Sequence, residues 1–301
     1  MDKTEAKGHS EEYFGDYRDY WYNFDFLELM AKRWELNNVQ TLLDVGCGQC
    51  HWTRLIASFL EKGSVVTAVD SEPKWGRENS RLRKFFAEQE ISFQIKEADV
   101  LSLPFEDNSF DAVTCQTLLI HIQNPIEALR EMKRVLKPDG ILICAEPNNL
   151  VASVLKDSLT ASDNVEDIIE RFTFGLIKEK GKINLGLGDN SLGDVLPGLL
   201  SQLKLKDITS YISDKVNFVI PPYQSKEMQA MIALKLTTEY KELLESESKA
   251  QFATFGDKYD LILPRMSEKS DLYKSELGDA LRDQTYFDGS GVLMYLVSGR
   301  K

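Results

Sequence analysis

The sequence predicts an α/β fold built on an open, doubly wound sheet of mostly parallel strands. An apolar run at 41–45 meets a Gly-x-Gly turn, and the residues after it take up the spacing of a helix. A β-branched run at 64–70 ends in an acid, Asp70, and a later helical pattern leads into an apolar run at 141–145. Strands and helices that alternate in this way predict a sheet covered by helices on both faces.

The first elements place a glycine turn at the head of a helix. Residues 10–36 are rich in aromatic side chains and become helical in spacing from Phe24. The turn at Gly46-Cys47-Gly48 can adopt positive φ and brings backbone N–H groups towards a ligand. The third glycine of a dinucleotide fingerprint is absent, because that position is His51. A nicotinamide-dependent oxidoreductase is therefore disfavoured.

The later elements follow the same alternation and then become less regular. We expect a charged helix over 73–90, strands over 91–96 and 112–116, and a helix opened by Asn124 and Pro125. Towards the C-terminus we expect a helix over 191–203, a strand over 205–219, a helical stretch to about 283 and a last strand over 291–297.

Composition and charge limit the classes of function. The net charge of -12 repels phosphate backbones, so no nucleic-acid partner is expected. The polar segment 1–12 does not read as a secretory signal, and the sequence shows no apolar run of about 18 residues, so we expect a cytoplasmic protein without a membrane partner. Cys47 and Cys50 form a Cys-x-x-Cys, but no second such pair exists and no metal site is expected.

Three stretches resemble the class I S-adenosylmethionine-dependent methyltransferases. The run 42–50, LLDVGCGQC, is similar to the first motif of that family, with Cys50 in place of its final glycine. The run 103–111, LPFEDNSFD, and the run 131–147, EMKRVLKPDGILICAEP, resemble two further segments of the family. The resemblance covers roughly residues 39–147, about a third of the chain.

The resemblance implies a Rossmann-like sheet of seven strands with an antiparallel last strand, and S-adenosyl-L-methionine as the cofactor. Asp70 also has a reason of its own, because it follows the glycine turn at the spacing of an acid that binds ribose hydroxyls. The cofactor-binding residues expected on these grounds are Asp44, Gly46, Cys47, Gly48, Asp70, Ser71, Asp99, Val100, Gln116 and Thr117.

The resemblance also implies a domain scheme. We expect an N-terminal aromatic lid over 1–38, the cofactor-binding core over 39–147, a helical insertion over 148–187 and the rest of the fold over 188–301. A second helical insertion is expected at about 221–285. Both insertions would cap the active site and select the substrate.

The predicted function is methyl transfer to a small-molecule acceptor. His121 is a candidate general base, because imidazole titrates near neutral pH, but it could equally be structural. Tyr13, Tyr17, Tyr20 and Trp21 are candidate substrate-binding residues. The alternative is a catalytically silent protein of this fold that binds the cofactor or a partner. The sequence does not define the acceptor or the oligomeric state.

Overall fold

The computed structural model describes residues 15–72, 74–75, 80–236 and 239–301. The chain divides into two compact units, which are described separately. The sheet unit comprises Tyr22–Asn148, Gly188–Asp214 and Leu293–Lys301, and the helical unit comprises Met1–Trp21, Asn149–Leu187 and Lys215–Val292.

The sheet unit contains seven strands in the order β3-β2-β1-β4-β5-β7-β6. The strands are β1 (Thr41–Val45), β2 (Val65–Asp70), β3 (Ser92–Glu97), β4 (Phe110–Gln116), β5 (Leu136–Pro147), β6 (Lys206–Ile212) and β7 (Met294–Arg300). The first five pair in parallel, and β7 runs antiparallel to both β5 and β6. The predicted doubly wound sheet with an antiparallel last strand is therefore confirmed.

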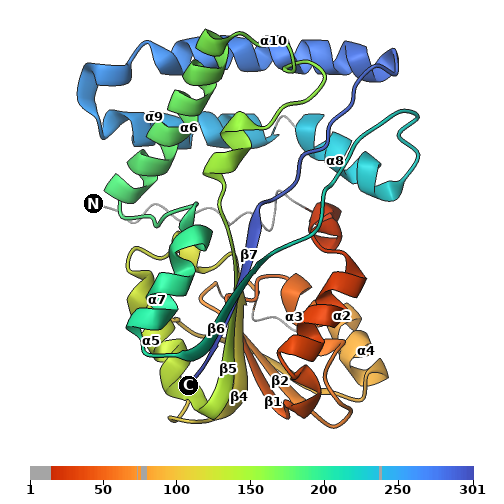
Figure 1. Ribbon diagram of the computed structural model, residues 1–301, viewed down its shortest axis with the longest axis vertical. Helices are drawn as coiled ribbons and strands as arrows, with labels where there is room; N and C mark the ends of the chain where they lie inside the picture. Colours follow the sequence, from red (N-terminus) through yellow and green to blue (C-terminus); the bar gives the residue numbers. More distant parts are fainter. Residues whose placement is uncertain (1–14, 73, 76–79, 237–238) are drawn as a thin grey trace. The chain divides into compact units, whose positions relative to one another are not determined.

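Helices cover both faces of this sheet (Figure 1). The helices of the unit are α2 (Phe24–Arg33), α3 (His51–Ala57), α4 (Ser80–Glu88), α5 (Pro125–Val135) and α7 (Leu196–Gln202), with the short 3-10 helices η2 (Leu36–Asn38), η3 (Leu119–His121) and η5 (Leu192–Val195). On the face covered by α5 and α7, buried Leu129, Met132 and Leu196 join a continuous apolar core with strand residues such as Val113. Burial of that core is the main favourable term in the folding of this unit.

Two sequence expectations about element lengths are corrected by the structure. The strand expected over 205–219 ends at Ile212, after which the Ser213 amide donates to the Met294 carbonyl at 2.9 Å and Val219 forms an isolated bridge with Asp288. Of the helix expected over 73–90, α4 covers Ser80–Glu88, whereas residues 74–75 and 89–90 are turns; positions 73 and 76–79 lie outside the described residues.

Over its described residues, the helical unit is built from four α-helices. They are α6 (Val165–Asn184), α8 (Lys226–Leu236), α9 (Glu239–Ala253) and α10 (Ile262–Arg282), with η1 (Gly15–Tyr20), η4 (Leu150–Val154) and η6 (Gly256–Tyr259). Helix α6 packs on α9, where the Phe174 and Phe252 rings lie 5.6 Å apart. Asn164 caps α6 by accepting a hydrogen bond from the Asp167 amide.

The unit boundaries can be set beside the predicted domain scheme. One boundary falls between Trp21 and Tyr22, inside the segment 1–38 expected to form a lid. The helical unit contains Asn149–Leu187 and Lys215–Val292, while the predicted insertions span 148–187 and about 221–285 and stay a prediction. Their capping role stays a prediction. In the part of the chain that the structure describes, none of the helices combines the length and apolar character needed to cross a bilayer.

Candidate cofactor-binding site

The glycine turn after β1 is held against the end of β2. The amides of Gly46 and Cys47 both donate to the Val69 carbonyl oxygen, at 2.8 and 3.0 Å. Gly46 has a φ of +71°, and a Cβ placed there would lie 2.7 Å from Cδ1 of Leu118. Both the backbone conformation and the close approach of Leu118 therefore require glycine at position 46.

Asp70 ties this turn to the next strand through its carboxylate. One oxygen accepts the Gly48 amide at 2.9 Å, and the other accepts the Glu72 amide at 2.9 Å. Asp70 is partly buried and Ser71 beside it is exposed. Because each carboxylate oxygen has more than one acceptor direction, Asp70 retains capacity for hydroxyl donors at the edge of the sheet.

A second predicted acid, Asp99, follows the end of the neighbouring strand β3. Asp70 pairs with Glu97 across β2 and β3, and the Ala98 amide donates to the Asp70 carbonyl at 2.9 Å. Asp99 is exposed, and one of its carboxylate oxygens accepts the Leu101 amide at 2.8 Å. Val100, in contrast, is buried in the apolar core. The structure thus brings the predicted residues of β2 and β3 to one edge.

The end of β4 contributes the last part of this edge. Gln116 is buried and donates from Nε2 to the Tyr22 hydroxyl at 2.8 Å. The Tyr22 ring lies 5.4 Å from that of Trp52 on α3. Thr117 has a φ of +49°, and its amide donates to the Ala145 carbonyl at 2.9 Å. The fold brings Tyr22 to Gln116, a contact that the sequence does not predict.

Asp44 and Cys47 have buried side chains. Asp44 accepts a hydrogen bond from the hydroxyl of Thr53, which lies in the first turn of α3. The Cys47 thiol shares a hydrogen bond with Cys50, and this bond together with burial raises its pKa. Cys115 and Cys144, which are in register on β4 and β5, are likewise free and buried. These side chains support the turn and the sheet, and the ligand contacts expected of Asp44 and Cys47 stay a prediction.

His121 lies in a short turn that a buried acid holds in place. The fully buried Glu146 accepts the amides of Leu118 and Leu119 on one carboxylate oxygen, at 3.0 and 2.8 Å. Burial raises the pKa of Glu146 to about 7, although the backbone amides act in the opposite direction. The His121 amide donates to the Leu118 carbonyl at 2.9 Å. Glu146 is a site residue that was not predicted, although an acid at the end of an apolar strand is a usable signal in the sequence.

The predicted substrate-binding aromatics belong to the helical unit. Tyr17 is buried and donates to Asn217 at 3.3 Å, while Asn217 donates to the Tyr20 carbonyl at 2.8 Å. Trp21 meets the Tyr17 ring edge-on, at 6.4 Å between centroids. Tyr17 also lines a cavity of about 590 Å³ within this unit. Tyr13 lies outside the described residues.

Comparisons with known proteins agree with this geometry. Residues 43–144 match the family described as a methyltransferase domain. An uncharacterized methyltransferase of Schizosaccharomyces pombe is 34% identical over 116 residues, which cover 38% of this chain and 42% of the relative. Demethylmenaquinone methyltransferase of Staphylococcus haemolyticus is 33% identical over 117 residues, covering 38% and 46%.

One solved structure shares the fold along most of the chain. A proposed methyltransferase from Bacillus halodurans C-125 superposes with a TM-score of 0.50 at 18% identity and covers 92% of this chain and 99% of that one. The matches to the two curated relatives, in contrast, span less than half the length of each relative.

The fold and the strand-end acids define a Rossmann-like α/β protein of the class that binds nucleotide cofactors at the carboxyl edge of its sheet. Within that class, residues 43–144 are similar to the family of methyltransferase domains.

Proposed function

We propose that this protein transfers a methyl group from S-adenosyl-L-methionine to a small-molecule acceptor. The observation that carries the proposal is the joint geometry of Gly46 and Asp70. The turn allows no side chain at position 46, and it is tied to an acid that keeps acceptor capacity. The family match supports the same activity.

The residues at the carboxyl edge fit the cofactor. Asp70 and Ser71 would hold the ribose hydroxyls, because a carboxylate can accept both hydrogen bonds of a vicinal diol. Asp99 and Val100 would hold the adenine, the first by accepting from its amino group and the second by apolar contact. Gln116 and Thr117, together with the turn at 46–48, would hold the methionine portion.

The protein's own contribution is chiefly orientation. The bound sulfonium supplies an activated methyl group, so alignment of the acceptor at about 3–3.5 Å and exclusion of water account for much of the rate. His121 would accept the proton of an acceptor that is not already ionised, and Glu146 would act as a positioning residue for its turn. Tyr17, Tyr20 and Trp21 are the proposed contacts for the acceptor.

The expected setting of this reaction follows from charge. With a net charge of -12, we propose a small molecule and not a nucleic acid or a membrane as the partner. A cytoplasmic location belongs to the same proposal.

The first test is thermal unfolding of the full chain with S-adenosylmethionine, S-adenosylhomocysteine or NAD. We expect the first two to raise the midpoint in a concentration-dependent way, as ligands that bind only the folded state do. Stabilisation by NAD alone would overturn the proposal. A shift with S-adenosylmethionine, followed by no transfer of its labelled methyl group to any of a broad set of acceptors, would favour the catalytically silent alternative.

A further inference from the structure

A second cavity in the helical unit has an excess of positive charge. It measures about 600 Å³ and is lined by residues of η4, α6, α8, α9 and α10. Among the residues that the structure describes, the charged side chains of the lining are those of Arg171, Lys178, Lys235 and Lys274 and the acid Glu179. In a chain of net charge -12, a concave site with this local balance favours an anionic ligand.

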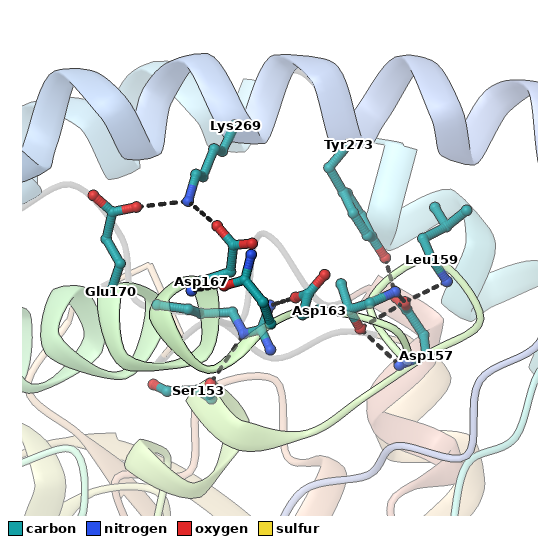
Figure 2. A network of polar contacts seen from close by, with 11 residues as sticks. Ser153, Asp157, Leu159, Asp163, Asp167, Glu170, Lys269 and Tyr273 are labelled. Atoms are coloured by element: carbon teal, nitrogen blue, oxygen red, sulfur yellow. Dashed lines mark hydrogen bonds and ion pairs between the residues drawn. The ribbon is translucent and has the colours of Figure 1, made fainter.

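Lys235 and Arg171 make ion pairs, and Lys274 also has an interaction partner. Lys235 contacts Asp288 at 2.8 Å, and Arg171 contacts Asp163. Figure 2 shows that Lys269 of α10 also forms ion pairs with two acids of α6. Its Nζ lies 2.7 Å from Asp167 and 2.6 Å from Glu170. These ion pairs neutralise cations along α6 and α10. Their acids are not among the described residues that line the cavity.

Two of the three guanidinium nitrogens of Arg171 donate hydrogen bonds within the helical unit. Its Nη1 donates to Asp163 and its Nε donates to the Ser153 carbonyl at 3.2 Å. Its Nη2 is buried and has no hydrogen-bond partner among the residues that the structure describes. A buried guanidinium nitrogen without a partner costs free energy, which a ligand oxygen would offset.

Lys178 is a second cation of the lining and lies about two turns after Arg171 on α6. Across the described part of the chain it makes no ion pair within 4.0 Å, and its ammonium lies 5.6 Å from the centroid of the Phe174 ring. Burial lowers its pKa, while the charges of Glu247 and Glu179 act in the opposite direction at longer range. An anion beside Lys178 would restore the charged form.

The rest of the lining defines the kind of anion. Ser153, Ser248 and Ser270 offer hydroxyl donors, and Leu234, Leu263 and Met266 offer apolar surface. Hydroxyls and cations suit carboxylate or phosphate oxygens, and the apolar side chains suit a hydrocarbon body.

We infer that this cavity binds an organic anion, with a carboxylate or phosphate group between Arg171 and Lys178 and an apolar body against α8 and α10. The site lies entirely within the helical unit, so the inference does not depend on methyl transfer.

The test is isothermal titration calorimetry of the full chain with octyl phosphate, octanoate and octyltrimethylammonium, which share one hydrocarbon chain. We expect one-to-one binding of at least one of the two anions and none of the cation. Binding of only one anion identifies the preferred head group. Equal binding of all three, or binding of neither anion, would overturn the inference.

Two variants locate the site. Lys178→Gln should weaken binding of the preferred anion about tenfold, because it removes a charge-assisted contact. Lys180→Gln, on an exposed position of the same helix, is the matched control and should bind like the wild type. Affinity of Lys178→Gln equal to that of the control would refute the assignment. S-adenosylmethionine binding, measured in parallel, separates a failure here from a failure of the proposed methyl transfer.

Discussion

Asp70 carries two roles that both depend on its carboxylate. Its carboxylate holds the Gly48 amide and is the proposed acceptor for the ribose hydroxyls. Asp70→Ala should weaken S-adenosylmethionine binding by roughly 1–3 kcal/mol, the usual cost of losing a charged acceptor. Calorimetric titration measures this loss, and Glu88→Gln, an exposed acid on α4, is the control. Unchanged affinity in Asp70→Ala would remove this residue from the site.

His121 can be tested apart from cofactor binding. The hydrogen bond from the His121 amide to the Leu118 carbonyl involves only the backbone. His121→Ala should therefore leave the turn in place. If the imidazole takes a proton from the acceptor, turnover should fall about 100-fold or more while S-adenosylmethionine affinity stays the same. The measurements are kcat with the identified acceptor and its pH profile. A wild-type rate in the variant would assign His121 a structural role.

Glu146 should make the stability of the sheet unit depend on pH. Its pKa is raised from 4.5 to about 7, so between these values the folded state binds more protons than the unfolded state. Its stabilising contribution is therefore complete below pH 4.5 and is lost as pH rises towards 7. Relative to Glu146→Gln, the wild type should lose about 3 kcal/mol over this range.

Chemical denaturation at several pH values measures this difference. The Gln variant is the control, because its amide does not titrate. A constant difference between the two proteins from pH 4.5 to 7 would show that Glu146 stays ionised in the folded state.

At the scale of elements, the contact between α6 and α9 depends on Gly181. A Cβ at this position would lie 2.4 Å from the Gln251 carbonyl oxygen, a backbone atom that cannot move aside cheaply. Gly181→Ala should therefore destabilise the helical unit by about 1–3 kcal/mol. Gly278→Ala on α10 is the matched control, since the nearest atom to its Cβ is Nη1 of Arg282 at 4.0 Å.

The control should be neutral or slightly stabilising, because alanine favours a helix over glycine where space allows. Thermal unfolding of both variants provides the comparison. Equal midpoints would mean that α6 and α9 can separate without loss of stability.

At the scale of the whole molecule, two ligands should leave separate signatures. S-adenosylmethionine should slow amide exchange in the sheet unit at 46–50, 70–72 and 97–101, where the proposed cofactor contacts lie. Octyl phosphate should slow exchange in α6, which carries Arg171 and Lys178. Hydrogen exchange with each ligand in turn measures both. The same pattern with either ligand would contradict the assignment of two sites.

The sequence alone determined the fold class and the edge at which the cofactor is expected. Short-range patterns fix these features: an apolar run, a glycine turn at 46–48 and an acid at Asp70 act over a few residues or at a set spacing. They specify strand, turn and helix because backbone conformation and apolar periodicity are local properties.

The tertiary structure decided what depends on distant residues. The extent of β6 depends on its pairing with β7, and the partners of Gln116 and Glu146 come from Tyr22 and from the turn at 118–119. The charge imbalance around Lys178 arises from helices far apart in sequence. Such features cannot be predicted from sequence patterns. Burial, hydrogen-bond partners and local charge depend on contacts between distant residues, which form only when the chain folds.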